Sequence, residues 1–234
     1  MAALAAVSSA REEARHEEFE RLKARLGAKA PAVPIESLVP TAIPSLDRLL
    51  EGGFPAGIVA TLEGERGGWS LAAALMASMT RRSLVAILDD GALYPPALAE
   101  AGACLDRVLV VPARKALAMA RAADILLRSR ICRMVLMPAV ALREAVWGRL
   151  AKLAHRTGVL LIVVAARAGA ALSATAAVRL HCVLERVLVH GRSGLWGTVA
   201  GFELSVHVRK HRHMAAGRSA LLRVQSDELD AALH

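Results

Sequence analysis

Aromatic residues and cysteines are scarce in this chain of 234 residues. Phe, Trp and Tyr make up 3% of it, while apolar residues of all kinds make up 55%. The core must therefore be built from Ala, Val, Leu and Ile, and the length suits one medium domain with a short appendage. Cys104, Cys132 and Cys182 lie far apart and form no CxxC pair. This spacing argues against a disulfide framework or a zinc site and suits a reducing compartment.

The chain also lacks a long hydrophobic run. Its mean hydropathy is +0.42, yet the longest apolar run, GVLLIVVAA, is about half as long as a membrane-spanning helix. The opening MAALAAVSSAREEARHEE has no basic region and turns acidic at once, which argues against a signal peptide. We expect a cytoplasmic protein without a membrane partner.

Acidic residues are fewer than basic ones, and hydrolase motifs are missing. The 30 Lys and Arg against 21 Asp and Glu give a net charge of +9, with an isoelectric point of about 10.4. This balance favours a polyanion such as nucleic acid as a partner, although a basic surface can also serve solubility alone.

No G-x-S-x-G stretch occurs, and the serines and histidines form no recognisable triad.

Apolar runs that alternate with helical patterns predict an α/β fold. Five runs are continuously apolar, as expected of parallel strands that are buried on both faces: 57–64, 83–90, 107–113, 133–140 and 158–167. Helical patterns separate them at 70–82, 95–102, 115–129 and 142–156. After residue 178 the pattern becomes strand, turn, strand, over 178–191, 202–213 and 219–226. We therefore predict a mainly parallel sheet flanked by helices, with antiparallel strands added at the C-terminal edge.

A polar helix precedes this core. The stretch SAREEARHEEFERLKARLG has a Ser cap, early carboxylates and basic residues near its end, with a narrow apolar stripe that includes Phe19, Leu22 and Leu26. We interpret 1–28 as a helical arm for a protein partner, because so polar a helix gains little from packing on its own domain. The prolines in AKAPAVPIE indicate a linker over 29–40. The core then spans 41–226, and 227–234 form a tail.

The stretch LEGERGGWSLAAAL stands where a nucleotide-binding loop is expected, between a strand and a helix. In the pattern G-x-x-x-x-G-K-[ST], backbone N–H groups surround the phosphates, the Lys neutralises them and the hydroxyl holds Mg²⁺. Here Glu63 replaces the first glycine and Trp69 replaces the lysine, whereas Gly68 and Ser70 match. The degenerate loop comprises Glu63, Gly64, Arg66, Gly67, Gly68, Trp69 and Ser70. We expect neither ATP hydrolysis nor tight ATP binding, and no cofactor. The pattern alone is also compatible with an ordinary glycine-rich turn.

The flanking residues resemble the RecA recombinase fold. IPSLDRLLEGGFPAGIVATLEGERGGWS is similar to the segment that leads into and forms its nucleotide loop, and the likeness extends over about 41–226. The resemblance places Pro138 where the fold carries a metal-directing Asp, and Ala165 and Ala166 where it carries a polar residue. Asp89 and Asp90 lie near the position of its water-activating Glu, with the wrong spacing. Three nucleotide-handling positions are thus lost together. Both DNA-binding loops of a recombinase look short, at LREAVWG and at AGAALSATAA.

A RecA-like core of this size, with degenerate nucleotide motifs and a polar helix in front, is similar to the ImuA family. This resemblance implies a non-catalytic accessory protein of bacterial SOS-induced translesion synthesis and mutagenesis, associated with the nucleoid. The implied partners are an ImuB-type protein, an error-prone replicative-type polymerase and RecA, with a second copy of the chain as a further partner. Two alternatives stay open: a SulA-like inhibitor of cell division, and an active ATPase in which Arg66 replaces the missing lysine.

Basic residues gather near the C-terminal end, in HVRKHRH. As a regular strand, this stretch would place His207, Arg209, His211 and His213 on one face and Val208, Lys210 and Arg212 on the other. We predict weak, non-specific DNA contact or a partner contact through Arg179, Arg209, Lys210, His211, Arg212 and His213. A solvated edge strand protected by charge is the alternative. We expect no metal site, because the neighbouring cations repel M²⁺. Trp196, at the predicted tip of GRSGLWG, is a candidate partner anchor.

Overall fold

In the computed structural model, the chain divides into two units, Met1–Pro31 and Ala32–His234. The structure describes residues 37–190 and 198–225, all within the second unit. The predicted arm with Phe19, Leu22 and Leu26, the tip with Trp196, and the tail 227–234 lie outside the described residues. Within the described ranges, no helix combines the length and the apolar character needed to cross a bilayer.

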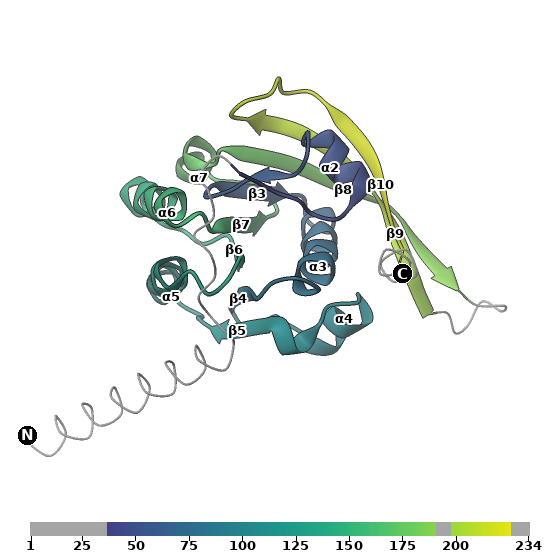
Figure 1. Ribbon diagram of the computed structural model, residues 1–234, viewed down its shortest axis with the longest axis horizontal. Coiled ribbons are helices and arrows are strands. Elements are labelled where there is room, and N and C mark those ends of the chain that lie inside the picture. Colours follow the sequence, from purple (N-terminus) through teal and green to yellow (C-terminus); the bar gives the residue numbers. More distant parts are fainter. Residues whose placement is uncertain (1–36, 191–197, 226–234) are drawn as a thin grey trace, which may run out of the picture. The chain divides into compact units, whose positions relative to one another are not determined.

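A mainly parallel sheet of eight strands forms the centre of the second unit (Figure 1). Its strands follow the order β10-β9-β8-β3-β7-β6-β4-β5. They are β3 (Val59–Glu63), β4 (Val85–Asp89), β5 (Val108–Pro112), β6 (Met134–Pro138), β7 (Leu160–Ala165), β8 (Val178–His190), β9 (Thr198–His211) and β10 (Ser219–Gln225). The strands β3 to β8 pair parallel with one another, whereas β8–β9 and β9–β10 pair antiparallel. This arrangement confirms the predicted fold class.

Helices cover both faces of this sheet (Figure 1). On one face lie α2 (Pro44–Leu49), α3 (Gly67–Thr80) and α4 (Pro95–Glu100), followed by the short 3₁₀ helix η1 (Leu105–Arg107). On the other face lie α5 (Ala116–Ser129), α6 (Glu144–Thr157) and α7 (Ala170–Thr175). The helix α7 occupies part of the stretch that sequence indicates as a second DNA-binding loop. A small antiparallel pair, β1 (Leu38–Val39) and β2 (Phe54–Pro55), lies on either side of α2 in the sequence, and β1 falls within the predicted linker.

Local sequence explains where several helices begin and end. Proline is the first residue of α2 and of α4, where its missing N–H costs nothing. Asp47 of the S-L-D stretch fixes the turn before α2, because its carboxylate accepts hydrogen bonds from the N–H groups of Thr41 and Ala42 and from the Thr41 hydroxyl. Gly158 ends α6 in the left-handed conformation with φ of 74°.

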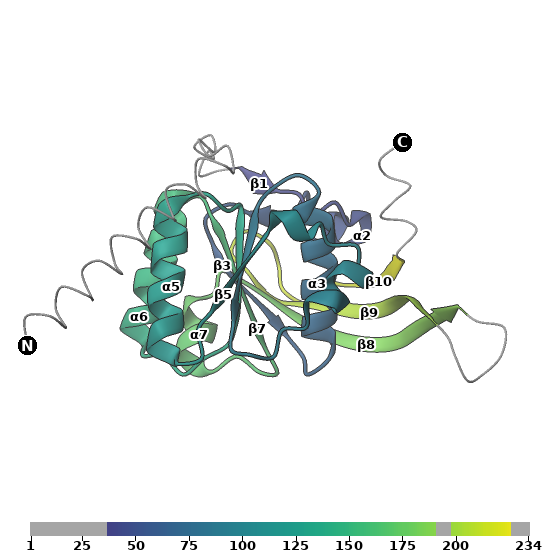
Figure 2. The ribbon, with the colours of Figure 1, turned by 90° about the horizontal axis from the view of Figure 1, so that it is seen from below.

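The core is aliphatic, as the composition requires. All five residues of β3 and all six of β7 are buried, which places these two strands at the centre of the sheet. Against them packs α3, with Leu71, Leu75 and Met76 fully buried. The paired strands β8 and β9 continue beyond the helices as a two-stranded ribbon (Figure 2). The nucleotide-loop position therefore lies at the carboxyl end of a central, rigid strand.

Candidate functional site

The predicted degenerate nucleotide loop, called the nucleotide loop below, connects β3 to α3 through Gly64, Glu65 and Arg66. It lies at the carboxyl end of β3, between β7 on one side and β8 on the other. In open α/β sheets this end of the strands is where ligands bind. The loop therefore lies between a strand and a helix, as the sequence predicts. The contacts of the loop residues determine which groups are available to a ligand.

The glycines of the loop are required by close packing against β8. A Cβ atom on Gly64 would lie 2.1 Å from the carbonyl oxygen of Cys182, and one on Gly67 would lie 2.3 Å from the same atom. Gly64 also has φ of +128°, which disfavours any side chain. These two glycines are therefore explained by the fold alone, whatever the loop binds.

Several N–H groups of the loop donate to protein carbonyls. The N–H of Gly64 donates to the carbonyl oxygens of Ala165 and Ala166 at 3.0 and 3.1 Å. The N–H of Gly68 donates to Gly64 O at 3.2 Å, and that of Ser70 donates to Arg66 O at 3.0 Å. In this structure α3 thus begins at Gly67 with its first turn closed on the loop. A phosphate that used these groups would compete with those carbonyls.

Glu63, at the position of the first glycine, forms a buried ion pair with Arg179 of β8. The Arg179 Nε donates to Glu63 Oε1 at 2.7 Å, and its Nη2 donates to Oε2 at 3.0 Å. The Thr61 hydroxyl donates to Oε1 at 2.9 Å, and the Ala168 N–H donates to Oε2 at 3.4 Å. The side chain of Glu63 is 7% exposed and that of Arg179 is 25% exposed. Both carboxylate oxygens are therefore occupied.

Electrostatics keep this carboxylate ionised. Burial raises the pKa of Glu63, but the hydrogen bonds from Arg179 and Thr61 and the charge of Arg179 outweigh it, so that the pKa lies below its usual value. Hydrogen bonding to Glu63 in turn raises the pKa of Arg179. The site thus has a fixed negative group beneath the loop, paired to a cation from the neighbouring strand. Arg179 is predicted to contact DNA or a partner, and only the N–H groups that this ion pair leaves unused are available for such a contact.

The remaining nucleotide positions lie at the same end of the sheet. Trp69, at the lysine position, lies in the first turn of α3 and is 44% exposed. The Ser70 hydroxyl donates to Arg66 O at 3.2 Å, and Arg66 is exposed. Pro138 is the last residue of β6, and its ring has no group that could ligate a metal ion. Within the described ranges, no cluster of three or more His, Cys, Asp or Glu side chains is suited to a metal ion.

The acidic pair after β4 orders its own turn. The Asp89 carboxylate accepts hydrogen bonds from the N–H groups of Gly91 and Leu93, both at 2.9 Å. Asp90 accepts one from Ala92 N at 3.3 Å. Such bonds from aspartate to the following backbone are typical of turns. These carboxylates therefore have a structural role at the end of β4.

A β-bulge changes the predicted faces of the C-terminal basic stretch. Lys210 pairs with Arg179 while Val208 pairs with Leu180, so that Arg209 has no partner in β8. Residues that pair across strands share a face of the sheet. Lys210 therefore lies on the same face as His207. His211, which pairs with Val178, lies on the same face as Val208. The predicted alternation, with His207, Arg209, His211 and His213 on one face, is wrong because one extra residue shifts the register.

This bulge separates the basic residues in space. The Lys210 ammonium donates to the carbonyl oxygens of Ser173 and Ala174 at 3.2 and 3.0 Å, at the C-terminal end of α7. The half-buried His211 has a pKa below its usual value, chiefly because of burial. Arg209, Arg212 and His213 are exposed, the last two in the turn after β9. The exposed charge of the predicted contact site is thus smaller than the sequence indicates.

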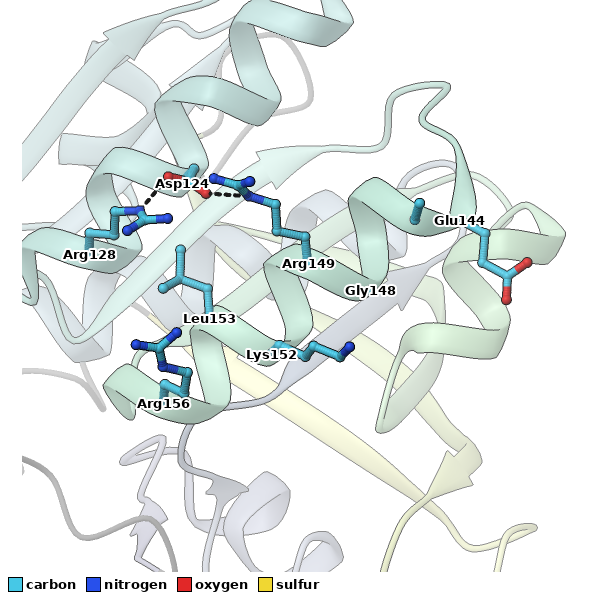
Figure 3. Close-up of a pocket in the computed structure, with 9 residues that line it drawn as sticks. Asp124, Arg128, Glu144, Gly148, Arg149, Lys152, Leu153 and Arg156 are labelled. Atoms are coloured by element: carbon cyan, nitrogen blue, oxygen red, sulfur yellow. Dashed lines mark hydrogen bonds and ion pairs between the residues drawn. The ribbon is translucent and has the colours of Figure 1, made fainter.

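A basic groove between α5 and α6 was not recognised from the sequence. Its charged lining consists of Asp124, Arg128, Glu144, Arg149, Lys152 and Arg156 (Figure 3). The signal that could have revealed it is helical spacing, because Arg149, Lys152 and Arg156 at i, i+3 and i+7 share one face of α6. The residues that α5 adds to the groove depend on how the two helices pack against each other, and no local sequence pattern predicts this packing.

Comparison with known proteins gives a likeness in structure alone. No protein-family model matches the chain, and no curated protein sequence matches it. A crystal structure of the RadB recombinase is similar, with a TM-score of 0.61 and 18% sequence identity. The similarity covers 81% of this chain and 97% of the RadB chain. The chain therefore has the RecA-like fold, the α/β architecture that it shares with this recombinase.

Proposed function

We propose that this protein is a non-catalytic accessory factor built on the RecA-like fold. The observation that carries the proposal is the buried ion pair between Glu63 and Arg179 at the nucleotide loop. A triphosphate would meet a fixed carboxylate where the recombinase pattern has a glycine, and an indole where it has a lysine. The carboxylate is already paired with Arg179 and the indole carries no charge, so neither position supplies the positive charge that binds a polyanion in the recombinase pattern. The retained scaffold then serves to bind macromolecular partners.

The role that we propose is in SOS-induced translesion synthesis and mutagenesis, near the nucleoid. It rests on the similarity to the ImuA family in the degenerate loop, the size of the core and the polar N-terminal segment. The proposed partners are an ImuB-type protein, an error-prone replicative-type polymerase and RecA. Weak, non-specific DNA contact and self-association belong to the same proposal. The arm over 1–28 is its proposed partner-binding element.

Nucleotide titration tests the non-catalytic part of the proposal. The exposed Arg66 in the loop favours one alternative, an ATPase in which this guanidinium replaces the lysine. We expect no saturable binding of Mg-ATP at micromolar concentrations by calorimetry, with a RecA recombinase as the positive control. Saturable binding that is abolished by Arg66→Ala would contradict the proposal and favour the ATPase.

Purified partners test the accessory role. The full chain and a truncation that begins near Pro34 are compared for capture of the ImuB-type protein, the polymerase, RecA and the tubulin-like division protein. We expect the full chain to capture at least one of the first three, and the truncation to lose affinity for it. Capture of the division protein alone would favour a SulA-like inhibitor. A truncation that keeps every affinity would remove the arm from the proposal.

A further inference from the structure

The groove between α5 and α6 is a concave, basic surface away from the nucleotide loop (Figure 3). This open groove has a volume of about 860 Å³, and its lining includes the four cations Arg128, Arg149, Lys152 and Arg156. Two carboxylates also line it, and Glu144 lies at the opposite end from Arg128 and Arg156 (Figure 3). We propose that this α5–α6 groove binds the phosphate backbone of duplex DNA.

Asp124 positions two of the four cations. Its carboxylate accepts a hydrogen bond from Arg128 Nε at 2.6 Å through Oδ2, and another from Arg149 Nε at 3.0 Å through Oδ1. One carboxylate of α5 thus holds an arginine of its own helix and an arginine of α6. Burial raises the pKa of Asp124, but the hydrogen bonds from the two arginines leave it lowered, which keeps the carboxylate ionised.

The arginine pair, Arg128 and Arg149, keeps most of its donors available. Each guanidinium has five N–H groups, and only the Nε group of each is used for Asp124. In the described part of the chain, neither Arg128 nor Arg149 donates a further side-chain hydrogen bond. Their side chains are 58% and 65% exposed. The Nε bond to Asp124 thus orients each exposed guanidinium and leaves its terminal nitrogens available, the arrangement that suits two-pronged binding of phosphate oxygens.

Lys152 and Arg156 extend the positive surface along α6. With Arg149 they follow one face of the helix, over about 10 Å at 1.5 Å per residue. Among the residues that the structure describes, no carboxylate lies within ion-pair distance of either side chain. Two unpaired cations beside the arginine pair leave a net positive charge, which attracts a chain of phosphates more strongly than a single anion.

The lining favours duplex DNA over other polyanions. Single-strand binding sites use aromatic side chains on which bases stack, and no aromatic residue lines this groove. Peptide partners need pockets for apolar anchors, whereas the apolar lining here comprises Ala145 and the largely buried Leu153. Phosphate contact by arginine and lysine needs neither feature and carries no sequence preference. This proposal rests on the DNA contact in the proposed function and assigns that contact to the groove. Because the groove shares no residue with the nucleotide loop, the groove can fail as a DNA site while the non-catalytic assignment stands.

Fluorescence anisotropy with a labelled duplex of about 20 base pairs tests the proposal, over roughly 50 to 200 mM salt. The full chain is compared with Lys152→Gln/Arg156→Gln. We expect roughly tenfold weaker binding at the lowest salt, with the slope of log affinity against log salt reduced by about 2, since each lost phosphate contact removes about 0.9. Unchanged affinity and slope would overturn the proposal.

A control variant separates the groove from net charge. Arg48→Gln/Arg82→Gln removes the same charge from exposed positions in α2 and just after α3. We expect it to keep the affinity of the full chain within roughly a factor of two, because long-range charge alone is screened by salt. An equal loss in both variants would show that DNA responds to overall charge, and would overturn the assignment to the groove.

Asp124→Asn tests the positioning of the arginine pair. This variant makes the groove more positive, so that attraction by charge alone predicts tighter binding. Our proposal predicts weaker binding, because Arg128 and Arg149 lose the carboxylate that orients them, while thermal unfolding confirms that the variant is folded. Tighter binding would overturn the role of Asp124. Competition by polyglutamate that equals competition by unlabelled duplex would instead assign the groove to an acidic protein partner.

Discussion

Two regions of this molecule place a carboxylate beside arginine, with opposite consequences. At the nucleotide loop, Glu63 is 7% exposed and receives both Nε and Nη2 of Arg179. In the α5–α6 groove, Asp124 is 18% exposed and receives only the Nε atoms of two arginines. The first pair satisfies its own charges inside the protein. The second leaves an excess of cations and terminal nitrogens that face solvent.

The difference shows that whether arginines near a carboxylate can still bind a ligand depends more on which of their N–H groups the carboxylate occupies than on the number of charged residues. In a largely buried site, an ion pair that occupies both carboxylate oxygens is a structural element, and removal of one partner is costly. At the surface, a single carboxylate can orient two guanidiniums at little cost and leave them open to a ligand. Four predictions test this contrast, from the largest expected effect to the smallest.

Of the four changes, Gly67→Ala should be the most damaging. Its Cβ would lie 2.3 Å from Cys182 O, 2.5 Å from Cys182 C and 2.9 Å from Val183 N, all of them backbone atoms of β8. Backbone cannot yield as a flexible side chain does, and we expect a loss of about 4 kcal/mol in the free energy of unfolding. Urea unfolding followed by far-UV circular dichroism measures it. A loss of less than about 1 kcal/mol would show that the loop is not packed against β8.

Arg179→Ala should destabilise the protein by about 3 kcal/mol, because it leaves the Glu63 carboxylate buried without its cation. We expect this value rather than a larger one because Arg179 is 25% exposed, and water can enter the vacated space. The same unfolding experiment measures it, with Glu63→Gln/Arg179→Ala as the matched control. The double variant should recover part of the loss, since a neutral amide costs less to bury. Equal losses in both variants would indicate that side-chain packing dominates.

The two carboxylates should also differ in their response to pH. The folded-state pKa of Glu63 lies below its usual value, so that its ion pair stabilises the protein fully above the unfolded pKa of about 4.3, and this contribution is lost as the pH falls toward the folded pKa. The difference in unfolding free energy between the wild type and Glu63→Gln/Arg179→Ala should therefore be constant above about pH 5 and shrink below it. The pKa of Asp124 is lowered as well, and the same comparison with Asp124→Asn should give a smaller change because that ion pair is more exposed. A difference that grows as the pH falls would contradict the assigned direction.

Much of the fold could be predicted because it depends on local pattern. The run GVLLIVVAAR is continuously apolar, and β7 within it is buried over its whole length, as expected of a central parallel strand. The switch to antiparallel strands after residue 178 is likewise confirmed by the pairing of β8 with β9. The position of the degenerate loop between β3 and α3 follows from the same alternation of strand and helix.

The features that sequence missed depend on contacts between distant segments. Glu63 and Arg179 are 116 residues apart, and only the parallel pairing of β3 with β8 brings them together. The bulge at Arg209 is invisible in an alternating stretch, because the register with β8 decides it. In the groove, spacing on α6 is local, but Asp124 and Arg128 come from α5. Charge patterns thus locate basic residues, and the tertiary structure decides which of them stay free.

Gly148 lines the groove, and its replacement by alanine has the smallest expected effect of the four changes. It can be compared directly with Gly67, the glycine of the nucleotide loop. It lies within α6, and a Cβ atom there would meet nothing within 4 Å. A glycine inside a helix costs about 0.5–1 kcal/mol relative to alanine, mainly through backbone entropy. Gly148→Ala should therefore raise the free energy of unfolding by about that amount, while duplex binding changes little, since no cation of the groove is touched. A loss of stability would mean that α5 and α6 pack more closely than the structure indicates. The same substitution, glycine to alanine, should thus have opposite signs in the closed loop and the open groove.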